Sequence, residues 1–110
     1  MRGYFADDLL LMMPTGTLAG VRLFGEVVSA HRAPLTVALT EQGRDSEEVT
    51  LDLTGVRCFA NSALEILVAL SRRLRPPQRL VVRAAPGLEL RERLVAHGWD
   101  DIDTLRLIDA

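Results

Sequence analysis

The chain has 110 residues, 48% of them hydrophobic and 25% charged, which fits one globular domain over 1–110 that can bury a core without metals or disulfides. A net charge of −2 argues against nucleic-acid binding, and the single cysteine, Cys58, excludes an internal disulfide and a cysteine-based zinc site. The apolar run 9–13 is too short to span a membrane, and acidic residues precede it where a signal peptide carries basic ones, so we expect a cytoplasmic protein.

The first half of the chain predicts a β-hairpin followed by a helix. Residues 9–13 resemble a strand, residues 14–17 have turn chemistry, and a second strand should run from about Leu18 to Gly25. Pro34 suits the first turn of a helix, and Gly43 suits the position just past its end. Between them, residues recur at spacings of three and four, as expected for one helical face: Leu35, Ala38, Leu39 and Gln42.

The second half predicts alternating strands and helices. Apolar and polar residues alternate over 49–53, as in a half-buried strand, and Thr54-Gly55 should end this strand. A helix over 63–74 should stop before Pro76. Residues 80–82 should form a short buried strand. Pro86-Gly87 should open a third helix with Leu90, Leu94 and Val95 inward, and 105–108 should form a last strand or a helical turn. The predicted class is therefore α/β in the order β-β-α-β-α-β-α, with helices packed on a mixed, mostly parallel sheet of four or five strands.

No residue pattern predicts a catalytic, cofactor or metal site. We expect His31 on the surface near a helix start and His97 in the last turn of a helix, where it can meet free carbonyls. Between Val56 and Phe59, Cys58 should be a buried thiol. The arginines from Arg72 to Arg83 are typical of a solvated surface. The alternative is that they bind an anion or an acidic partner.

Three roles are possible for Ser62. Ser62-Ala63-Leu64-Glu65 fits the S-x-x-E capping box of a helix start, in which the hydroxyl accepts a free backbone N–H and Glu65 reaches back to the cap. A serine at a helix start also lies where free N–H groups and the helix dipole favour a phosphate. A third possibility, Ser62 as a nucleophile, needs His31 or His97 as its base, and neither has a suggestive spacing.

The stretch LDLTGVRCFANSALEILVAL (51–70), with GEVVSAH upstream and LVAHGWDDI downstream, resembles the STAS domain, and within that family the bacterial anti-sigma factor antagonists. A gapless comparison with the family's strand, F-x-D-S-S-G-L loop and helix places Ser62 at the phosphoacceptor serine. Gly25-Glu26 matches the family's G-E-L-D, and 98–101 match its G-L-D-D turn. The resemblance covers 18–110, with 1–17 as an N-terminal strand and turn.

This resemblance implies a single STAS-like domain without enzymatic activity. It would bind an anti-sigma factor or a related serine-kinase regulatory protein, with no nucleic-acid or membrane partner, and phosphorylation of Ser62 would switch that binding. Whether the chain forms a homodimer is left open. The resemblance also implies the residues that would meet the partner: Gly25, Glu26, Cys58, Phe59, Ala60, Asn61, Ser62, Ala63 and Glu65.

The sequence departs from the family pattern around the serine. Ala60 stands at the usual acidic position, Asn61 at the usual first serine or threonine, and Ala63 at the usual glycine. Val28 replaces the aspartate of G-E-L-D, and Glu65, in place of a second small residue, would repel a phosphate at close range. The alternative to a phosphorylation-switched regulator is therefore a divergent STAS-like scaffold or small-ligand sensor that lacks the phosphorylation switch.

Overall fold

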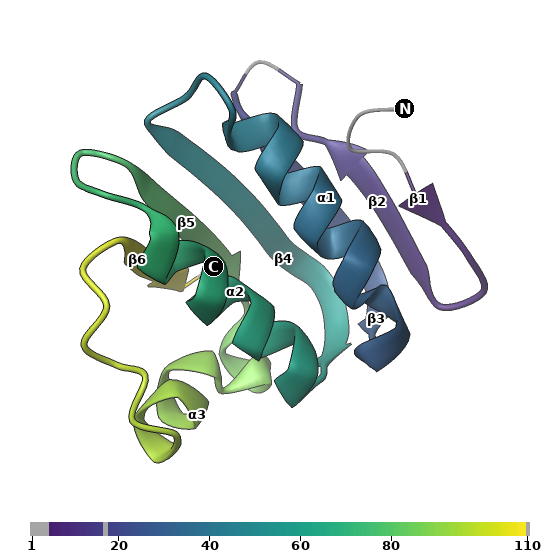
Figure 1. The fold of residues 1–110 in the computed structure, drawn as a ribbon. Coiled ribbons are helices and arrows are strands. Elements are labelled where there is room, and N and C mark those ends of the chain that lie inside the picture. The colour runs from purple at the N-terminus through teal and green to yellow at the C-terminus, as the bar shows by residue number, and fades with distance from the viewer. Residues whose placement is uncertain (1–4, 17, 110) are drawn as a thin grey trace.

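The computed structural model describes residues 5–16 and 18–109, which form one six-stranded sheet and three helices (Figure 1). The strands are β1 (Phe5–Ala6), β2 (Leu10–Pro14), β3 (Gly20–Val27), β4 (Glu48–Phe59), β5 (Arg79–Ala84) and β6 (Leu105–Asp109). The helices are α1 (Arg32–Gly43), α2 (Asn61–Arg73) and α3 (Leu90–Ala96), and two 3-10 turns are η1 (Ser29–His31) and η2 (Pro86–Leu88).

The strands lie in the sheet in the same order as in the chain, from β1 to β6. β1, β2 and β3 pair antiparallel, whereas β3, β4, β5 and β6 pair parallel. This confirms the predicted α/β class and the mixed, mostly parallel sheet. The order β-β-α-β-α-β-α runs from β2 to α3, and β1 and β6 enlarge the sheet to six strands instead of four or five. Residues 105–108 thus belong to a strand, the first of the two alternatives.

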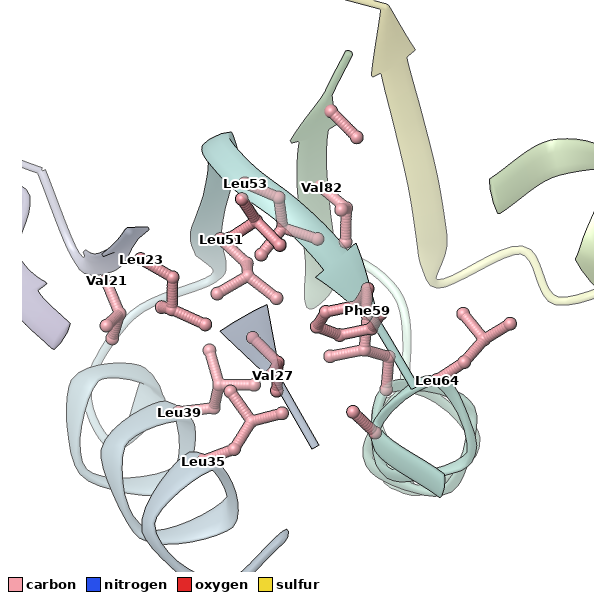
Figure 2. Packing of buried hydrophobic residues seen from close by; sticks show 14 of the residues in the cluster. Val21, Leu23, Val27, Leu35, Leu39, Leu51, Leu53, Phe59, Leu64 and Val82 are labelled. Atoms are coloured by element: carbon pink, nitrogen blue, oxygen red, sulfur yellow. The ribbon is translucent and has the colours of Figure 1, made fainter. Parts of the chain in front are cut away.

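The core lies between one face of the sheet and the helices α1 and α2 (Figures 1 and 2). Alternate strand residues point toward these helices, because successive side chains of a strand point to opposite faces of the sheet. Figure 2 shows Val21, Leu23, Leu51 and Leu53 on the sheet side, and Leu35, Leu39 and Leu64 facing them from the helices. The apolar spacing in the sequence therefore selected the correct helix faces for α1 and α2.

The third helix is shorter than the sequence suggested, because Pro86–Leu88 forms the turn η2 and α3 begins at Leu90. Leu90 and Leu94 are buried as expected, but Val95 is 56% exposed, so its predicted inward position is wrong. With only seven residues, α3 presents a narrow apolar stripe to the domain.

Strand β4 continues through Thr54-Gly55 to Phe59, so the predicted strand end at that pair is wrong. The pairing with β3 shows the reason. Arg22 pairs with Asp52 and Phe24 with Gly55, so three residues of β4 lie opposite two of β3. The extra residue forms a β-bulge, which shifts the alternation of inward and outward side chains along β4. The strand continues beyond the bulge. This continuation carries β4 to the start of α2.

We expect Gly55→Ala to lower the free energy of unfolding by about 1–2 kcal/mol, since overpacking has a cost of this order. A Cβ at Gly55 would lie 2.5 Å from Cδ1 of Phe24, so the half-exposed ring would have to shift. Urea denaturation measures the change. Gly87→Ala is the matched control, because a Cβ there meets nothing within 4 Å. Equal effects of the two substitutions would contradict the packing of Phe24 over Gly55.

Candidate functional site

The candidate site lies at the edge of the sheet where β3 and β4 end and α2 begins. Val27 and Phe59 are paired at the ends of these two strands, and the Ala60 N–H donates to the Val27 carbonyl at 2.9 Å. Ala60 is extended (φ −65°, ψ 153°), and its carbonyl accepts the N–H groups of Ala63 and Leu64 at 3.0 Å. Ala60 is therefore the N-cap of α2, and the junction contains a single non-helical residue.

The predicted capping box at Ser62 is wrong. Because the cap is Ala60, Ser62 is the second residue of the helix, and Glu65 lies beyond the first turn and is exposed. An alanine offers no side-chain oxygen to the free N–H groups of the helix start, and no side-chain cap is formed. The strand reaches Phe59 because this ring is needed in the core, and so the helix begins earlier than the S-x-x-E pattern indicated.

The residues that the family resemblance singled out divide into a surface set and a buried set. Cys58, Asn61 and Glu65 are exposed, and Ala60 and Ser62 are half-buried beside them. By contrast, the Phe59 side chain is 3% exposed and that of Ala63 is 0% exposed, so these two belong to the core. Cys58 is exposed, and its predicted burial is wrong, because the bulged end of β4 turns the thiol away from the core.

Glu26 joins this surface from the neighbouring strand. It pairs with Cys58 across β3 and β4, and its carboxylate accepts from Arg57 Nε at 3.0 Å. Gly25 has a structural role. Its φ is +107°, and a Cβ there would lie 2.1 Å from the Leu9 carbonyl oxygen. Only glycine permits this approach of the chain before β2 to β3. Gly25 therefore shapes the strand that presents Glu26.

Arg93 of α3 fixes the junction from the other side, and no local sequence pattern predicts this role. Its Nη2 donates to the Phe59 carbonyl at 2.6 Å and to Asn61 Oδ1 at 2.7 Å, and its Nε donates to Asn61 Oδ1 at 3.2 Å. Nη1 also donates to the Leu88 carbonyl at 3.4 Å. A planar guanidinium with several donors can hold backbone and side-chain oxygens together. One half-buried arginine thus connects the end of β4, the start of α2 and η2.

His31 fixes the adjoining loop after β3. It is 1% exposed, so its predicted surface position is wrong, while its place next to the start of α1 is correct. The Val28 N–H donates to His31 Nδ1 at 3.0 Å, and Nε2 lies 2.7 Å from Asp7 Oδ2. Because Nδ1 accepts, the neutral ring carries its proton on Nε2 and donates it to Asp7. The ring also meets Phe5 edge to face, with centroids 5.8 Å apart.

The hydrogen bond to His31 and the N–H groups of Leu9 and Leu10 hold the pKa of Asp7 below its usual value of 3.8. A lowered folded-state pKa contributes stability above the unfolded-state pKa, and this contribution is lost as the pH falls through the folded-state pKa. The free energy of unfolding of Asp7→Asn, measured by urea denaturation, should therefore fall less steeply than that of the wild type as the pH drops below about 4. Asp8→Asn is the control, with the same charge change outside these hydrogen bonds. An unchanged acid slope in Asp7→Asn would contradict the contact.

His97 ends α3 as predicted. Its Nδ1 lies 2.9 Å from the Arg93 carbonyl oxygen, and its ring stacks on Trp99 with centroids 4.5 Å apart. Among the described residues, neither imidazole hydrogen-bonds to Ser62: both nitrogens of His31 are occupied elsewhere, and His97 is bound to its own helix. Neither histidine is therefore placed as the base that the nucleophile hypothesis assigned to it.

A cavity of about 310 Å³ lies at the opposite end of the domain, between the ends of α1 and α2 and the start of β4. Its walls include Leu39, Val49 and Leu74, with Arg44 and Arg73 also lining it. Over residues 5–16 and 18–109, no helix combines the length and the apolar character needed to cross a membrane.

The fold is similar to that of a protein with a known structure. No protein-family model and no curated protein sequence matches the chain. The crystal structure of an anti-sigma factor antagonist from Mycobacterium paratuberculosis superposes with a TM-score of 0.69 at 23% sequence identity, over 92% of this chain and 88% of that one. The chain therefore has the STAS fold of that anti-sigma factor antagonist.

Proposed function

We propose that the chain is a cytoplasmic regulatory domain that binds an anti-sigma factor or a related serine-kinase regulatory protein. The binding surface is the edge formed by Glu26, Arg57, Cys58 and the start of α2 at 61–65. The observation that carries this proposal is the hydrogen-bonded junction between β4 and α2. Arg93 and the Ala60 N–H fix its backbone, while Cys58, Asn61 and Glu65 remain exposed around Ser62. A surface that is ordered before binding loses little conformational entropy on association.

Phosphorylation of Ser62 is the proposed regulation of this surface. As the second residue of α2, Ser62 lies among the first N–H groups, which have no partner within the helix. A phosphate there would be compatible with the helix dipole and would add nearly two negative charges to the middle of the surface. Exposed Glu65 follows three positions later, and Glu26 contributes a further carboxylate. Phosphorylation would therefore make the edge strongly acidic and weaken binding by repulsion and desolvation.

Ser62→Asp should weaken binding to a serine-kinase anti-sigma factor of the same organism by roughly tenfold or more, which corresponds to about 1.4 kcal/mol. Ser62→Ala should bind as the wild type does, because the hydroxyl is not the helix cap. Isothermal titration calorimetry measures both affinities. Ser46→Asp is the matched control, since half-buried Ser46 lines the cavity at the other end of the domain. Equal affinities of Ser62→Asp and Ser46→Asp would exclude the proposed surface.

The second candidate is a STAS-like scaffold or small-ligand sensor without the switch. The cavity of about 310 Å³ favours it, because pockets of this size hold small ligands. The departures at Ala60 and Asn61 favour it too, and Asn61 Oδ1 is already bonded to Arg93. Intact-mass measurement after incubation with MgATP and the kinase partner separates the two candidates. One added phosphate on Ser62 supports the switch, and an unchanged mass supports the second candidate.

A further inference from the structure

The sheet has one face that no helix covers in the part of the chain that the structure describes. α1 and α2 pack on the other face (Figure 1), and the strand residues pointing there are buried. The strand residues that point away from the helices include Leu11, Met13, Arg22, Phe24, Arg83, Arg106 and Ile108, and all of them are exposed. β3 to β6 are parallel, and parallel strands are normally covered on both faces. The bare face is therefore unusual for this architecture.

One half of this open face is apolar. Leu11 is 41% exposed, Met13 39% and Phe24 38%. Leu11 and Phe24 are directly paired across β2 and β3, and Met13 pairs with Arg22 in the next row of the same face. The Phe24 ring lies over Gly55, which extends the apolar surface onto β4. Neighbouring apolar side chains in paired strands make one continuous patch of the kind that marks an interaction site.

The other half of the open face is basic. Arg22, Asp52 and Arg83 lie side by side in one row across β3, β4 and β5, and Arg106 lies on β6 in the adjacent row. Asp52 is only 8% exposed. Burial by itself raises the pKa of Asp52, but hydrogen bonds from Thr54 and the charges of Arg22 and Arg83 outweigh it, so the pKa is lowered. The carboxylate is thus ionised and already bonded to Arg22. On the same face Arg79 is paired with Glu48 at 2.7 Å, whereas among the described residues neither Arg83 nor Arg106 forms an ion pair.

We propose that this open face binds an acidic amphipathic helix of a partner protein, with its apolar stripe on Leu11, Met13 and Phe24 and its carboxylates on Arg83 and Arg106. The charge of the face selects this occupant over a second copy of the chain. A two-fold pairing centred on the apolar half would leave Arg83 and Arg106 without the carboxylates that an acidic helix supplies, because Asp52 is buried and already paired with Arg22. This surface adjoins the edge around Ser62, because Glu26 follows Phe24 by two residues on β3, but Leu11 and Met13 on β2 and the arginines of β5 and β6 lie outside that edge. Binding of a helix here does not require the function proposed for the edge.

Two stapled helical peptides of about 15 residues test the proposal. Both carry leucines at i, i+3, i+4 and i+7; one has glutamates at the flanking positions, and its twin has lysines there. The glutamate peptide should bind at least about tenfold more tightly by fluorescence anisotropy, and this preference should weaken with added salt. Its amide NMR footprint should cover β2, β3, β5 and β6. In the double variant Arg83→Glu/Arg106→Glu the preference should reverse, so that the lysine peptide binds more tightly.

The double variant Arg72→Glu/Arg75→Glu is the matched control, because it makes the same charge change at exposed positions near the end of α2 and should keep the glutamate preference. Leu11→Gln, at an exposed position, should weaken binding of the glutamate peptide without reversing the preference. The proposal is overturned if neither peptide binds, if both bind equally, or if the two double variants behave alike. A concentration-dependent dimer in light scattering that Leu11→Gln abolishes would instead assign the face to a second copy.

Discussion

Arg93→Ala should lower the free energy of unfolding by about 2–3 kcal/mol, because a hydrogen bond to a charged group contributes about 1.5–3 kcal/mol. The substitution removes the donors to the Phe59 carbonyl and to Asn61 Oδ1 and leaves the half-buried junction without these partners. Amide hydrogen exchange should quicken at Ala63 and Leu64, whose N–H groups bond to Ala60 at the start of α2. Urea denaturation and exchange monitored by NMR measure both effects.

Arg91→Ala is the matched control, since Arg91 is an exposed arginine on the same helix. It should change the stability by less than about 0.5 kcal/mol, as surface substitutions usually do. Arg93→Lys should restore only part of the loss, because an ammonium group cannot reproduce the planar fork. If Arg93→Ala and Arg91→Ala gave the same stability and the same exchange rates, Arg93 could not be the residue that fixes the junction.

His31→Ala should lower the free energy of unfolding by about 3 kcal/mol or more, for two reasons. It leaves a cavity where a fully buried ring packs on Phe5, and truncation of large buried side chains costs about 2–5 kcal/mol. It also leaves the Val28 N–H and the Asp7 carboxylate without their shared partner. Because η1 contacts both α1 and α2, the loss should spread to the loop beside the candidate site.

His97→Ala provides the comparison within the same residue type. That imidazole is exposed, stacks on Trp99 and bonds only to the carbonyl of its own helix, so its loss should cost less than about 1 kcal/mol. Urea denaturation at neutral pH compares the two variants. An effect of His31→Ala no greater than that of His97→Ala would mean that the contacts of His31 with Asp7 and Val28 do not hold the loop.

The elements whose signals are local were predictable from the sequence. The alternation at 49–53, the three-and-four spacing around Leu35 and Leu64, and the two prolines after Leu74 identified a strand, two helices and a helix end. The alternation and the three-and-four spacing arise because burial of one face of a strand or helix makes apolar residues recur at a fixed interval in the sequence. The α/β class then followed from the order of the elements, since connections between parallel strands need a crossover.

The contacts that build the candidate site were not predictable in this way, because they join residues far apart in the chain. Arg93 meets Asn61 across 32 positions, and His31 meets Asp7 across 24. Neither residue differs in its local pattern from an ordinary surface arginine or histidine. The S-x-x-E pattern at Ser62 failed for a related reason: the demand for Phe59 in the core extended β4 and moved the cap to Ala60. Tertiary packing there decided the helix start over the local capping signal.

The most direct test of the account is the amide NMR footprint of a serine-kinase anti-sigma factor on the isotope-labelled chain. We expect the largest shift changes at Glu26, at residues 57–62 and at Glu65, with the phosphorylated chain losing this footprint at the same protein concentrations. Footprints confined to the cavity around Leu39 and Val49, or to the open face around Leu11 and Phe24, would contradict the assignment of partner binding to the junction of β4 and α2.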